Sequence, residues 1–494
     1  MRWLLFATCL LTVRCDEEYE FWEAAEAGDT TAMARLLESA PDIDLDYPDA
    51  DGRTPLLLAT LGNHAGAVRF LLQRGADAEV PGRWPAPPHG PLATAAALNH
   101  VATMDVLLEG GAAANAATGP DGRTPLLVAA EAGSLDAVDL FLSVGADVDE
   151  RRLDGATAAC AAAQGGHADV LRRLLDAGAN VHVSDSVDGS SLVHYAARAP
   201  TAAAVKLVLA AGADPRIRSG VGVPTDATFE DGREPAREDL RGGLTPLMAS
   251  AASAASEALE ALLDFATRHV AKDELANYVD AVDASGRTAL AWAAASPARG
   301  PAATACLEIL YAHGARDDSV TVEGDGLLHI AARGNARAVA YLVDARGFEV
   351  DQRALSEQRS TPLTLAASEG AVTAAKALLR RGADVDATAS DGSTPLHAAA
   401  SADQTPVARL LLKRGANPLA QLAGGEFPSQ KCPKTPRGRM LKYSLSRAER
   451  KAWSRLEKAF GGAEPPDAAV EDGIDAAAVE DLEADEEDSD RDEL

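Results

Sequence analysis

Residues 391–418 read DGSTPLHAAASADQTPVARLLLKRGANP and predict two short helices joined by a turn. Thr394 is a favoured N-cap, and Pro395 suits the first helical position because its missing N–H would have no partner there. A second helix is predicted from apolar residues on one side, namely Val407, Leu410, Leu411 and Leu412. Gly415 follows this helix and can adopt the left-handed conformation that ends it.

The same unit recurs along most of the chain. Clear openings of such units lie at Thr54, Thr124, Thr157, Ser191, Thr245, Thr288, Thr361 and Thr394. The T-P-L-H-x-A motif and its period of about 33 residues, as from Thr361 to Thr394, resemble the ankyrin repeat. This resemblance implies an all-α repeat solenoid of stacked helix–turn–helix units with loop or β-hairpin fingers. It also implies that the concave surface binds proteins.

The boundaries of the array follow from where this pattern starts and fails. We expect about eleven repeats over residues 16–421, with an insertion at 219–241 that lengthens one inter-repeat loop. Residues 422–462 are expected to form a basic amphipathic C-terminal cap helix. Residues 463–494 hold 15 Asp or Glu and no aromatic residue, a composition typical of a disordered acidic tail.

The predicted cap helix has more than one possible function. Ser446 and Glu449 have the spacing of a capping box, which marks a helix N-terminus. Between 431 and 458 there are 10 Lys or Arg against two acidic residues. The helix could therefore cap the last repeat, bind an acidic partner or membrane surface, or receive the acidic tail.

Composition excludes several classes of function. The chain has 494 residues and a formal net charge of −29, which argues against nucleic acid because phosphate binding needs a basic surface. Its five cysteines have no C-x-x-C spacing, so neither a zinc site nor a thioredoxin-like motif is predicted. Cys432 is expected to be the more exposed thiol and a candidate for reactivity.

The two ends of the chain resemble targeting signals. Residues 1–15 read MRWLLFATCLLTVRC, an apolar run behind Arg2 that fits a signal peptide and is too short to span a bilayer. The last four residues, Arg491, Asp492, Glu493 and Leu494, resemble the K-D-E-L retrieval signal, which a retrieval receptor would bind. Together they predict the lumen of the endoplasmic reticulum. The alternative is a cytoplasmic or nuclear adaptor with an apolar N-terminal cap. The sequence contains no N-x-S/T glycosylation sequon, so glycosylation gives no additional support for a lumenal location.

No catalytic motif is present, and no cofactor or metal site is predicted. His194, His329 and His397 occupy the histidine position of the repeat motif, where the resemblance implies a hydrogen bond between repeats. No transmembrane segment is predicted, because charges interrupt every Leu-rich stretch. The sequence therefore predicts a non-catalytic scaffold that is a monomer and binds a protein partner. A weaker alternative is low-affinity calcium buffering or chaperone-like activity through the acidic tail.

The candidate partner-binding residues lie at the tips of the inter-repeat loops. Trp84 is the leading candidate, because an exposed Trp in a Pro-rich loop is a typical hot spot. The insertion is the other candidate, since long loops in compact arrays are often functional. The full set is Trp84, Arg53, Arg123, Asp154, Asp188, Phe229, Arg287, Arg359 and Asp391.

Overall fold

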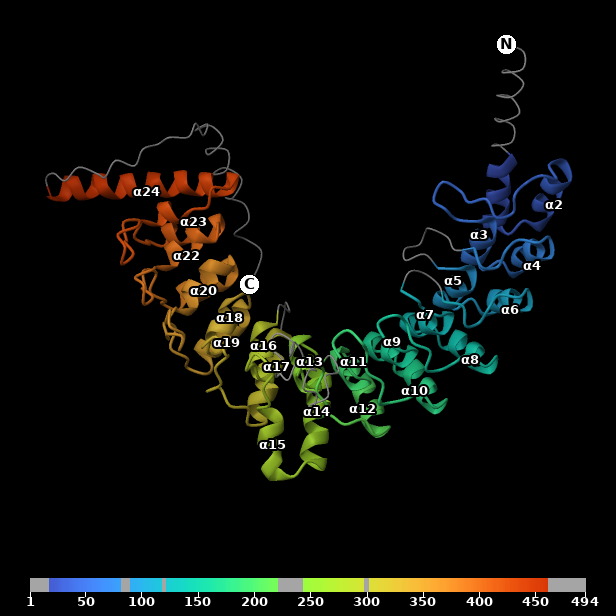
Figure 1. Ribbon diagram of the computed structural model, residues 1–494, viewed down its shortest axis with the longest axis horizontal. Helices are drawn as coiled ribbons and strands as arrows, with labels where there is room; N and C mark the ends of the chain where they lie inside the picture. Colours follow the sequence, from blue (N-terminus) through green and yellow to red (C-terminus); the bar gives the residue numbers. More distant parts are fainter. Residues whose placement is uncertain (1–16, 81–88, 118–120, 221–242, 297–301, 461–494) are drawn as a thin grey trace, which may run out of the picture. The chain divides into compact units, whose positions relative to one another are not determined.

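The computed structural model describes residues 17–80, 89–117, 121–220, 243–296 and 302–460. The chain divides into two compact units, an N-terminal unit of residues 1–284 and a C-terminal unit of residues 285–494. Both units are built from successive pairs of short helices (Figure 1).

The described part of the N-terminal unit holds seven helix pairs and one additional helix. Residues 17–27 are helical and pair with α2 (Thr30–Ser39). The following pairs are α3 (Pro55–Leu61) with α4 (Ala65–Gln73), α5 (Pro91–Ala97) with α6 (Val101–Glu109), α7 (Pro125–Ala132) with α8 (Leu135–Ser143), α9 (Ala158–Gly165) with α10 (Ala168–Asp176), α11 (Leu192–Arg198) with α12 (Ala202–Ala210), and α13 (Pro246–Ala252) with α14 (Ser256–His269). The additional helix, α15 (Lys272–Val279), follows the long α14.

The described part of the C-terminal unit holds four helix pairs and a closing segment. The pairs are α16 (Ala289–Ala295) with α17 (Ala302–Ala312), α18 (Leu327–Ala332) with α19 (Ala336–Asp344), α20 (Pro362–Glu369) with α21 (Val372–Arg380), and α22 (Pro395–Ser401) with α23 (Thr405–Lys413). A 3₁₀ turn, η1 (Pro428–Lys431), and the long helix α24 (Pro436–Phe460) follow the last pair.

The first helix of each pair begins where the sequence predicts. Thr54, Thr124, Thr245 and Thr361 each accept a hydrogen bond on Oγ1 from the backbone N–H three residues later, at 3.2–3.3 Å. Such capping satisfies an N–H that would otherwise lack a partner at the helix N-terminus. Pro55 and its counterparts then occupy the first helical position. The Thr-Pro signature therefore sets the start of the helix in each of these repeats.

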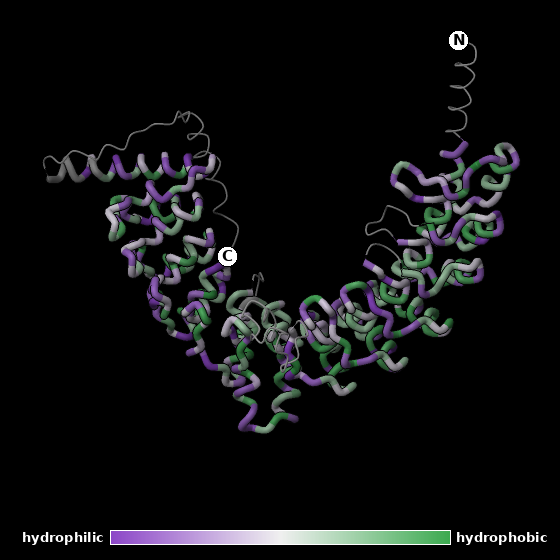
Figure 2. Tube along the Cα trace, in the orientation of Figure 1, coloured by the Kyte–Doolittle hydropathy of each residue, from purple (hydrophilic) through white to green (hydrophobic). Residues whose placement is uncertain are grey.

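Stacking between pairs forms the core. Within each unit, the first helices of successive pairs contact one another, as α5, α7 and α9 do, and the second helices make a separate row of contacts. The first helices are almost fully buried; in α3, Pro55 to Thr60 are all inaccessible. The second helices bury only one side, such as Val68 and Leu71 in α4. Hydrophobic residues recur along the helices of both rows, and hydrophilic residues lie in many loops (Figure 2).

Carboxylates join the loops that follow the second helices. Asp149 accepts a hydrogen bond from the backbone N–H of Asn180 at 2.9 Å, across a spacing of 31 residues. The same contact joins Asp46 to Asp77, Asp351 to Asp384, and Asp386 to Asn417. These carboxylates are structural, because each satisfies a backbone donor of the next repeat.

The structure confirms the predicted all-α repeat solenoid, while the fingers that join the repeats are almost entirely loops. Among the described residues, Ser184 and Ser191 form an isolated β-bridge, and Arg123 is the other residue in a bridge. The hairpin form is therefore nearly absent from these fingers.

The predicted capping box in the C-terminal helix is wrong. Helix α24 begins at Pro436, so Ser446 lies in its interior. Glu449 is buried and instead accepts hydrogen bonds from Ser429 in η1, from the backbone N–H at 3.3 Å and from Oγ at 3.1 Å. The spacing of Ser446 and Glu449 reflects the side of α24 that packs against η1 and the last helix pair.

Candidate protein-binding surface

Adjacent fingers are joined by a repeated backbone hydrogen bond. In the N-terminal unit, Leu153 donates its N–H to the carbonyl of Asp121 at 3.0 Å, and Ser186 donates to Asp154 at 2.7 Å. In the C-terminal unit the same bond joins Val322 to Ser285, Leu355 to Gly324, Ser390 to Gln358, and Ala423 to Asp391, at 2.8–3.1 Å. The fingers within each unit therefore form an ordered edge, which we call the finger edge.

Apolar side chains recur on this edge in contact with solvent. Leu153 is 77% exposed and Val187 on the next finger is 67% exposed. In the C-terminal unit, Val322 is 60% exposed and Leu355 on the next finger is 77% exposed. A single exposed apolar side chain is ordinary, whereas contiguous exposed apolar surface marks an interaction site. The pairs on neighbouring fingers therefore make the finger edge a candidate surface.

None of these four residues is among the candidates predicted from the sequence. Three of them directly precede an Asp-Gly or Glu-Gly turn, namely Leu153, Val187 and Val322. An apolar residue beside a turn is visible in the sequence. Whether its side chain is exposed depends on the conformation of the finger, which the sequence does not give. At Leu153 the preceding finger approaches closely, since a Cβ added to Gly122 would lie 3.2 Å from the Leu153 Cγ. Gly122 also has φ of +71°, which favours glycine.

Two predicted arginines of the N-terminal unit are held in local ion pairs. Arg53 pairs with Asp49 at 2.8 Å and with Asp51 at 3.0 Å. Arg123 pairs through Nε with Asp121 at 2.5 Å and through Nη1 with Glu131 of α7 at 2.7 Å. Arg123 lies at the finger edge, beside Asp121, and both arginines pair within their own repeats.

The two predicted aspartates of this unit are also paired. Asp154 lies 2.5 Å from Arg152, and Asp188 lies 3.4 Å from Arg198 of α11. Partial burial acts against ionisation at both carboxyls. Hydrogen bonds from Arg152 and the Ala156 N–H nevertheless hold the pKa of Asp154 below its ordinary value. At Asp188, hydrogen bonds from Ser190 lower the pKa of the carboxyl. Both therefore remain charged at neutral pH.

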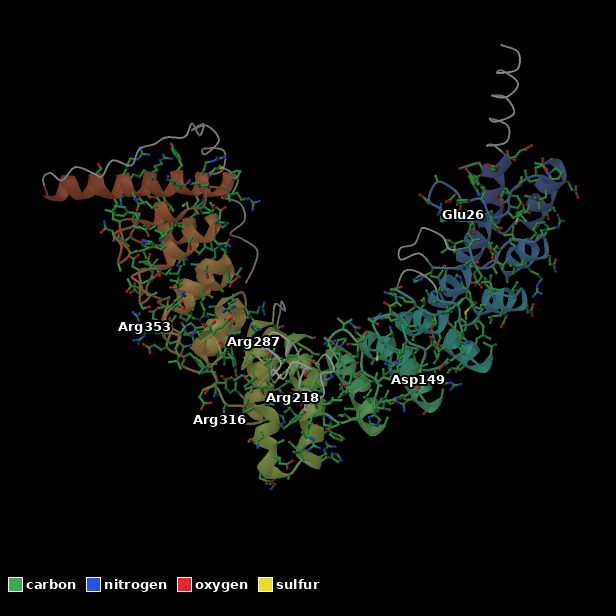
Figure 3. All side chains as sticks on the ribbon, in the orientation of Figure 1. Glu26, Asp149, Arg218, Arg287, Arg316 and Arg353 are labelled. Atoms are coloured by element: carbon green, nitrogen blue, oxygen red, sulfur yellow. The ribbon has the colours of Figure 1, made fainter. Side chains whose placement is uncertain are left out.

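The predicted residues of the C-terminal unit occupy three separate fingers. Arg287, labelled in Figure 3, places its guanidinium carbon 5.1 Å from the centre of the Trp292 ring in α16. Arg359 is exposed and has a left-handed φ of 48°. Asp391 accepts a hydrogen bond from the Ser393 N–H at 2.9 Å, and hydrogen bonds from Ser393 lower the pKa of its carboxyl.

The structure brings none of these charged candidates into a common cluster. Each lies on a different finger, and adjacent fingers are connected through the backbone hydrogen bonds of the finger edge. Trp292 is a further candidate binding residue that was not predicted. Its half-buried indole lies beside Arg287, and Trp and Arg are both enriched at binding hot spots.

Several predicted features lie outside the described residues. These are Trp84, Phe229, the N-terminal residues 1–15 and the tetrapeptide 491–494. The two ends of the insertion are described and lie together, since Ser219 donates its N–H to the carbonyl of Leu244 at 2.8 Å. Arg218 (Figure 3) donates to the carbonyls of Gly243 and Val282, at 3.1 and 2.6 Å. The insertion therefore leaves and rejoins the array at one point.

The motif histidines are structural, as the resemblance implied. His194 Nε2 donates to the carbonyl of Leu244 at 2.9 Å, and its Nδ1 accepts the N–H of Ser191 at 3.1 Å. His329 and His397 also donate from Nε2, to the carbonyls of Ser360 and Glu426. Burial lowers the pKa of His194 to about 4 and lowers the pKa values of the other two. All three rings are therefore neutral at pH 7.

Cys432 is the most exposed of the three described cysteines, as predicted, but its environment disfavours the reactive thiolate. The thiol is half-buried, and burial followed by the nearby Asp403 raises its pKa to about 12. Cys160 and Cys306 are buried. Among the described residues, no group of three or more His, Cys, Asp or Glu is placed to hold a metal ion. None of the described helices combines the length and apolar character needed to cross a bilayer.

Comparison with family models places these repeats. A model described as ankyrin repeats (3 copies) matches residues 87–152, 142–219, 295–389 and 327–421, more than half of the chain. The chain belongs to the ankyrin-repeat family. A second model, ankyrin repeats (many copies), matches residues 21–72 of the same array.

Individual relatives match only parts of the array. A putative ankyrin repeat protein, FPV240 of fowlpox virus, is 42% identical over 66 residues, or 13% of this chain and 16% of that protein. An L-asparaginase of Dirofilaria immitis is 27% identical over 135 residues, or 27% of this chain and 22% of that protein. The chain thus spans less than a quarter of either relative. The solved ankyrin repeat domain of human ASB11 is 22% identical, with a TM-score of 0.39, and the match covers 49% of this chain and 96% of that one.

Proposed function

We propose that this chain is a non-catalytic scaffold that binds a protein partner through the finger edge. The observation that carries this proposal is the recurrence of exposed apolar residues on neighbouring fingers, Leu153 with Val187 and Val322 with Leu355. Burial of such side chains against a partner contributes about 25 cal/mol for each Å² of apolar surface removed from water. The membership of the ankyrin-repeat family supports the same class of function.

The polar surroundings of these residues fit a specific interface. The pairs Arg152–Asp154 and Arg198–Asp188 flank the apolar residues of the N-terminal unit. Because these charges are already paired within the fingers, a partner need not supply counter-ions for them. The partner therefore presents apolar side chains to the fingers, with polar groups at the rim.

Site-specific photo-crosslinking tests which surface is used. A benzophenone amino acid placed at Leu153 should crosslink the partner in cells, whereas the same probe at Val144 should not. Val144 is a matched control because it is also exposed, at 49%, but lies at the end of α8 instead of on a finger. Equal crosslinking at both positions would remove the finger edge as the binding surface.

We further propose that the protein acts in the lumen of the endoplasmic reticulum. The support is the agreement between the signal-like residues 1–15 and the retrieval-like residues 491–494. A receptor for the C-terminal tetrapeptide is the implied second partner. The alternative location is the cytoplasm or nucleus.

A glycosylation acceptor can report the compartment directly. Asp391→Asn completes an Asn-Gly-Ser sequence with Gly392 and Ser393 on an exposed finger. A lumenal chain should gain an endoglycosidase-sensitive glycan, and the added Ser393→Ala change should abolish it. If the glycan is absent and residues 1–15 remain on the mature chain, the protein is not lumenal. Deleting 491–494 from a lumenal chain should cause secretion.

A further inference from the structure

Helix α24 carries a surface whose charge is opposite to that of the chain as a whole. Its buried side includes Leu441, Leu445 and Glu449, and the helix contacts η1, α22 and α23. The rest of the helix surface carries exposed Lys and Arg side chains, and hydrophilic residues recur along the helix (Figure 2). We call this set of cations the basic surface of α24: Arg437, Arg439, Lys442, Arg447, Arg450, Lys451 and Arg455.

These cations form no ion pair among the side chains that the structure describes. Helix α24 carries two carboxylates, Glu449 and Glu457, against eight Lys or Arg. Glu449 is buried and accepts both hydrogen bonds from Ser429. Among the side chains that the structure describes, no carboxylate lies within 4.0 Å of any of the seven cations. Elsewhere in the array arginines are commonly paired, as Arg381 is with Asp344 at 2.5 Å. The basic surface therefore lacks the local counter-ions that other repeats provide.

We propose that the acidic segment 463–494 of the same chain binds the basic surface of α24. The segment carries 15 carboxylates, and Arg491 is its single cation. It begins three residues beyond Phe460, the last residue of α24. Charge and position in the chain therefore select the same occupant.

The segment is long enough to cover the whole surface. The 25 residues of α24 extend about 38 Å at 1.5 Å per residue. The chain beyond Phe460 reaches up to about 110 Å when extended, at roughly 3.3 Å per residue. Because the segment is tethered to the helix, its effective concentration is of millimolar order, which favours it over free acidic competitors.

Binding in this way gives α24 a regulated surface. When the segment is bound, anionic lipid and nucleic acid do not meet the basic side chains. When a stronger anionic partner displaces the segment, the basic surface and the C-terminal residues become accessible together. The contact should weaken with salt, since the Debye length falls from about 8 Å at 0.15 M to about 3 Å at 1 M ionic strength.

Competition by a peptide in trans tests the proposal on the full chain. The probe is a fluorescein-labelled peptide of residues 463–494, and its anisotropy is measured against three forms of the protein. The first is wild type, and the second replaces the acidic residues of 463–494 with Asn and Gln. The third adds to the second form five changes on α24: Arg439→Gln, Lys442→Gln, Arg447→Gln, Arg450→Gln and Lys451→Gln.

A matched control keeps the change in net charge constant. It adds five changes to the second form at exposed cations on other helices that have no ion pair among the described residues: Arg172→Gln, Lys206→Gln, Arg337→Gln, Arg380→Gln and Lys413→Gln. All forms should retain the wild-type circular dichroism spectrum and urea midpoint, which shows that they fold.

The expected result is tight, salt-sensitive binding of the peptide to the second form and to its control. Wild type should bind at least about tenfold more weakly, because its own segment competes, and the third form should lose binding. Equal binding to the second and third forms would overturn the proposal, as would binding to wild type that is as tight as to the second form. A second experiment measures the binding of the protein to vesicles of phosphatidylcholine and phosphatidylserine. If they bind wild type and the second form equally, the surface serves a membrane and not the segment.

Discussion

The backbone N–H of Leu153 donates a hydrogen bond to the carbonyl oxygen of Asp121 at 3.0 Å, while the Leu153 side chain remains 77% exposed. The residue is therefore fixed by its backbone to the neighbouring finger and offers its side chain to solvent. A rigid apolar side chain loses little conformational freedom on binding, which is favourable for an interface. The same relationship joins Leu355 to Gly324 in the C-terminal unit.

Acid should destabilise the repeat that contains His194. Its pKa is about 4 in the folded chain and about 6.5 in an unfolded one, so the unfolded state binds an extra proton between these values. Stability should fall as pH decreases through this window, by about 2 kcal/mol from this group between pH 7 and pH 5. Urea unfolding at both pH values measures this effect. His194→Gln should reduce the pH dependence, and an unchanged slope would contradict a buried neutral ring.

Glu449 should be required for α24 to pack on the last repeat. Glu449→Ala leaves the Ser429 N–H and O–H without their partner in a buried place, at a cost of about 1–3 kcal/mol. Hydrogen exchange of α24 peptides should therefore become faster. Glu357→Ala, on an exposed finger, is the control and should leave that exchange unchanged. Slow exchange in the Glu449→Ala chain would show that other contacts hold the helix.

Cys432 should resist alkylation in the native protein. With a pKa of about 12, its thiolate fraction near pH 8 is about a thousandfold below that of a thiol at the ordinary value of 9.0. Peptide-resolved mass spectrometry after iodoacetamide treatment should show slow labelling in buffer and fast labelling in urea. Equally fast labelling in both would indicate an open thiol.

Removing the insertion should leave the array folded. Because Ser219 and Leu244 are hydrogen-bonded, deleting residues 221–242 shortens a loop whose ends already lie together. A shorter loop changes the closure entropy by only about 1 kcal/mol or less. Circular dichroism and the urea midpoint should stay close to wild type. A large loss of stability would mean that the insertion packs against the repeats.

The repeated unit was predictable because its signals are local. Thr394, Pro395 and Gly415 act within one turn of their own helix, so the sequence alone predicts both helices of that repeat. Ser446 and Glu449 show the limit of such reasoning. Their spacing satisfies a capping pattern, yet the helix starts earlier because packing against η1 holds Glu449 on the buried side.

The candidate site was less accessible from sequence for a related reason. The charged residues at the finger tips were recognisable, but Arg123 and Asp154 are occupied by partners within their own unit. The exposure of Leu153 depends on the conformation of two fingers at once. An apolar residue in a loop does not reveal whether it folds inward, so Leu153 and its counterparts emerged only from the three-dimensional structure.

Binding of the isolated partner to finger-edge variants tests the central claim most directly. The partner identified by crosslinking is titrated against wild type, Leu153→Ser/Val187→Ser and Val322→Ser/Leu355→Ser. The control, Leu98→Ser/Val144→Ser, removes one Leu and one Val that are 46% and 49% exposed at helix ends. All variants should keep wild-type stability to within about 0.5 kcal/mol. We predict that at least one finger-edge variant binds about tenfold or more weakly, while the control binds like wild type. Unchanged affinity in both finger-edge variants would contradict the account.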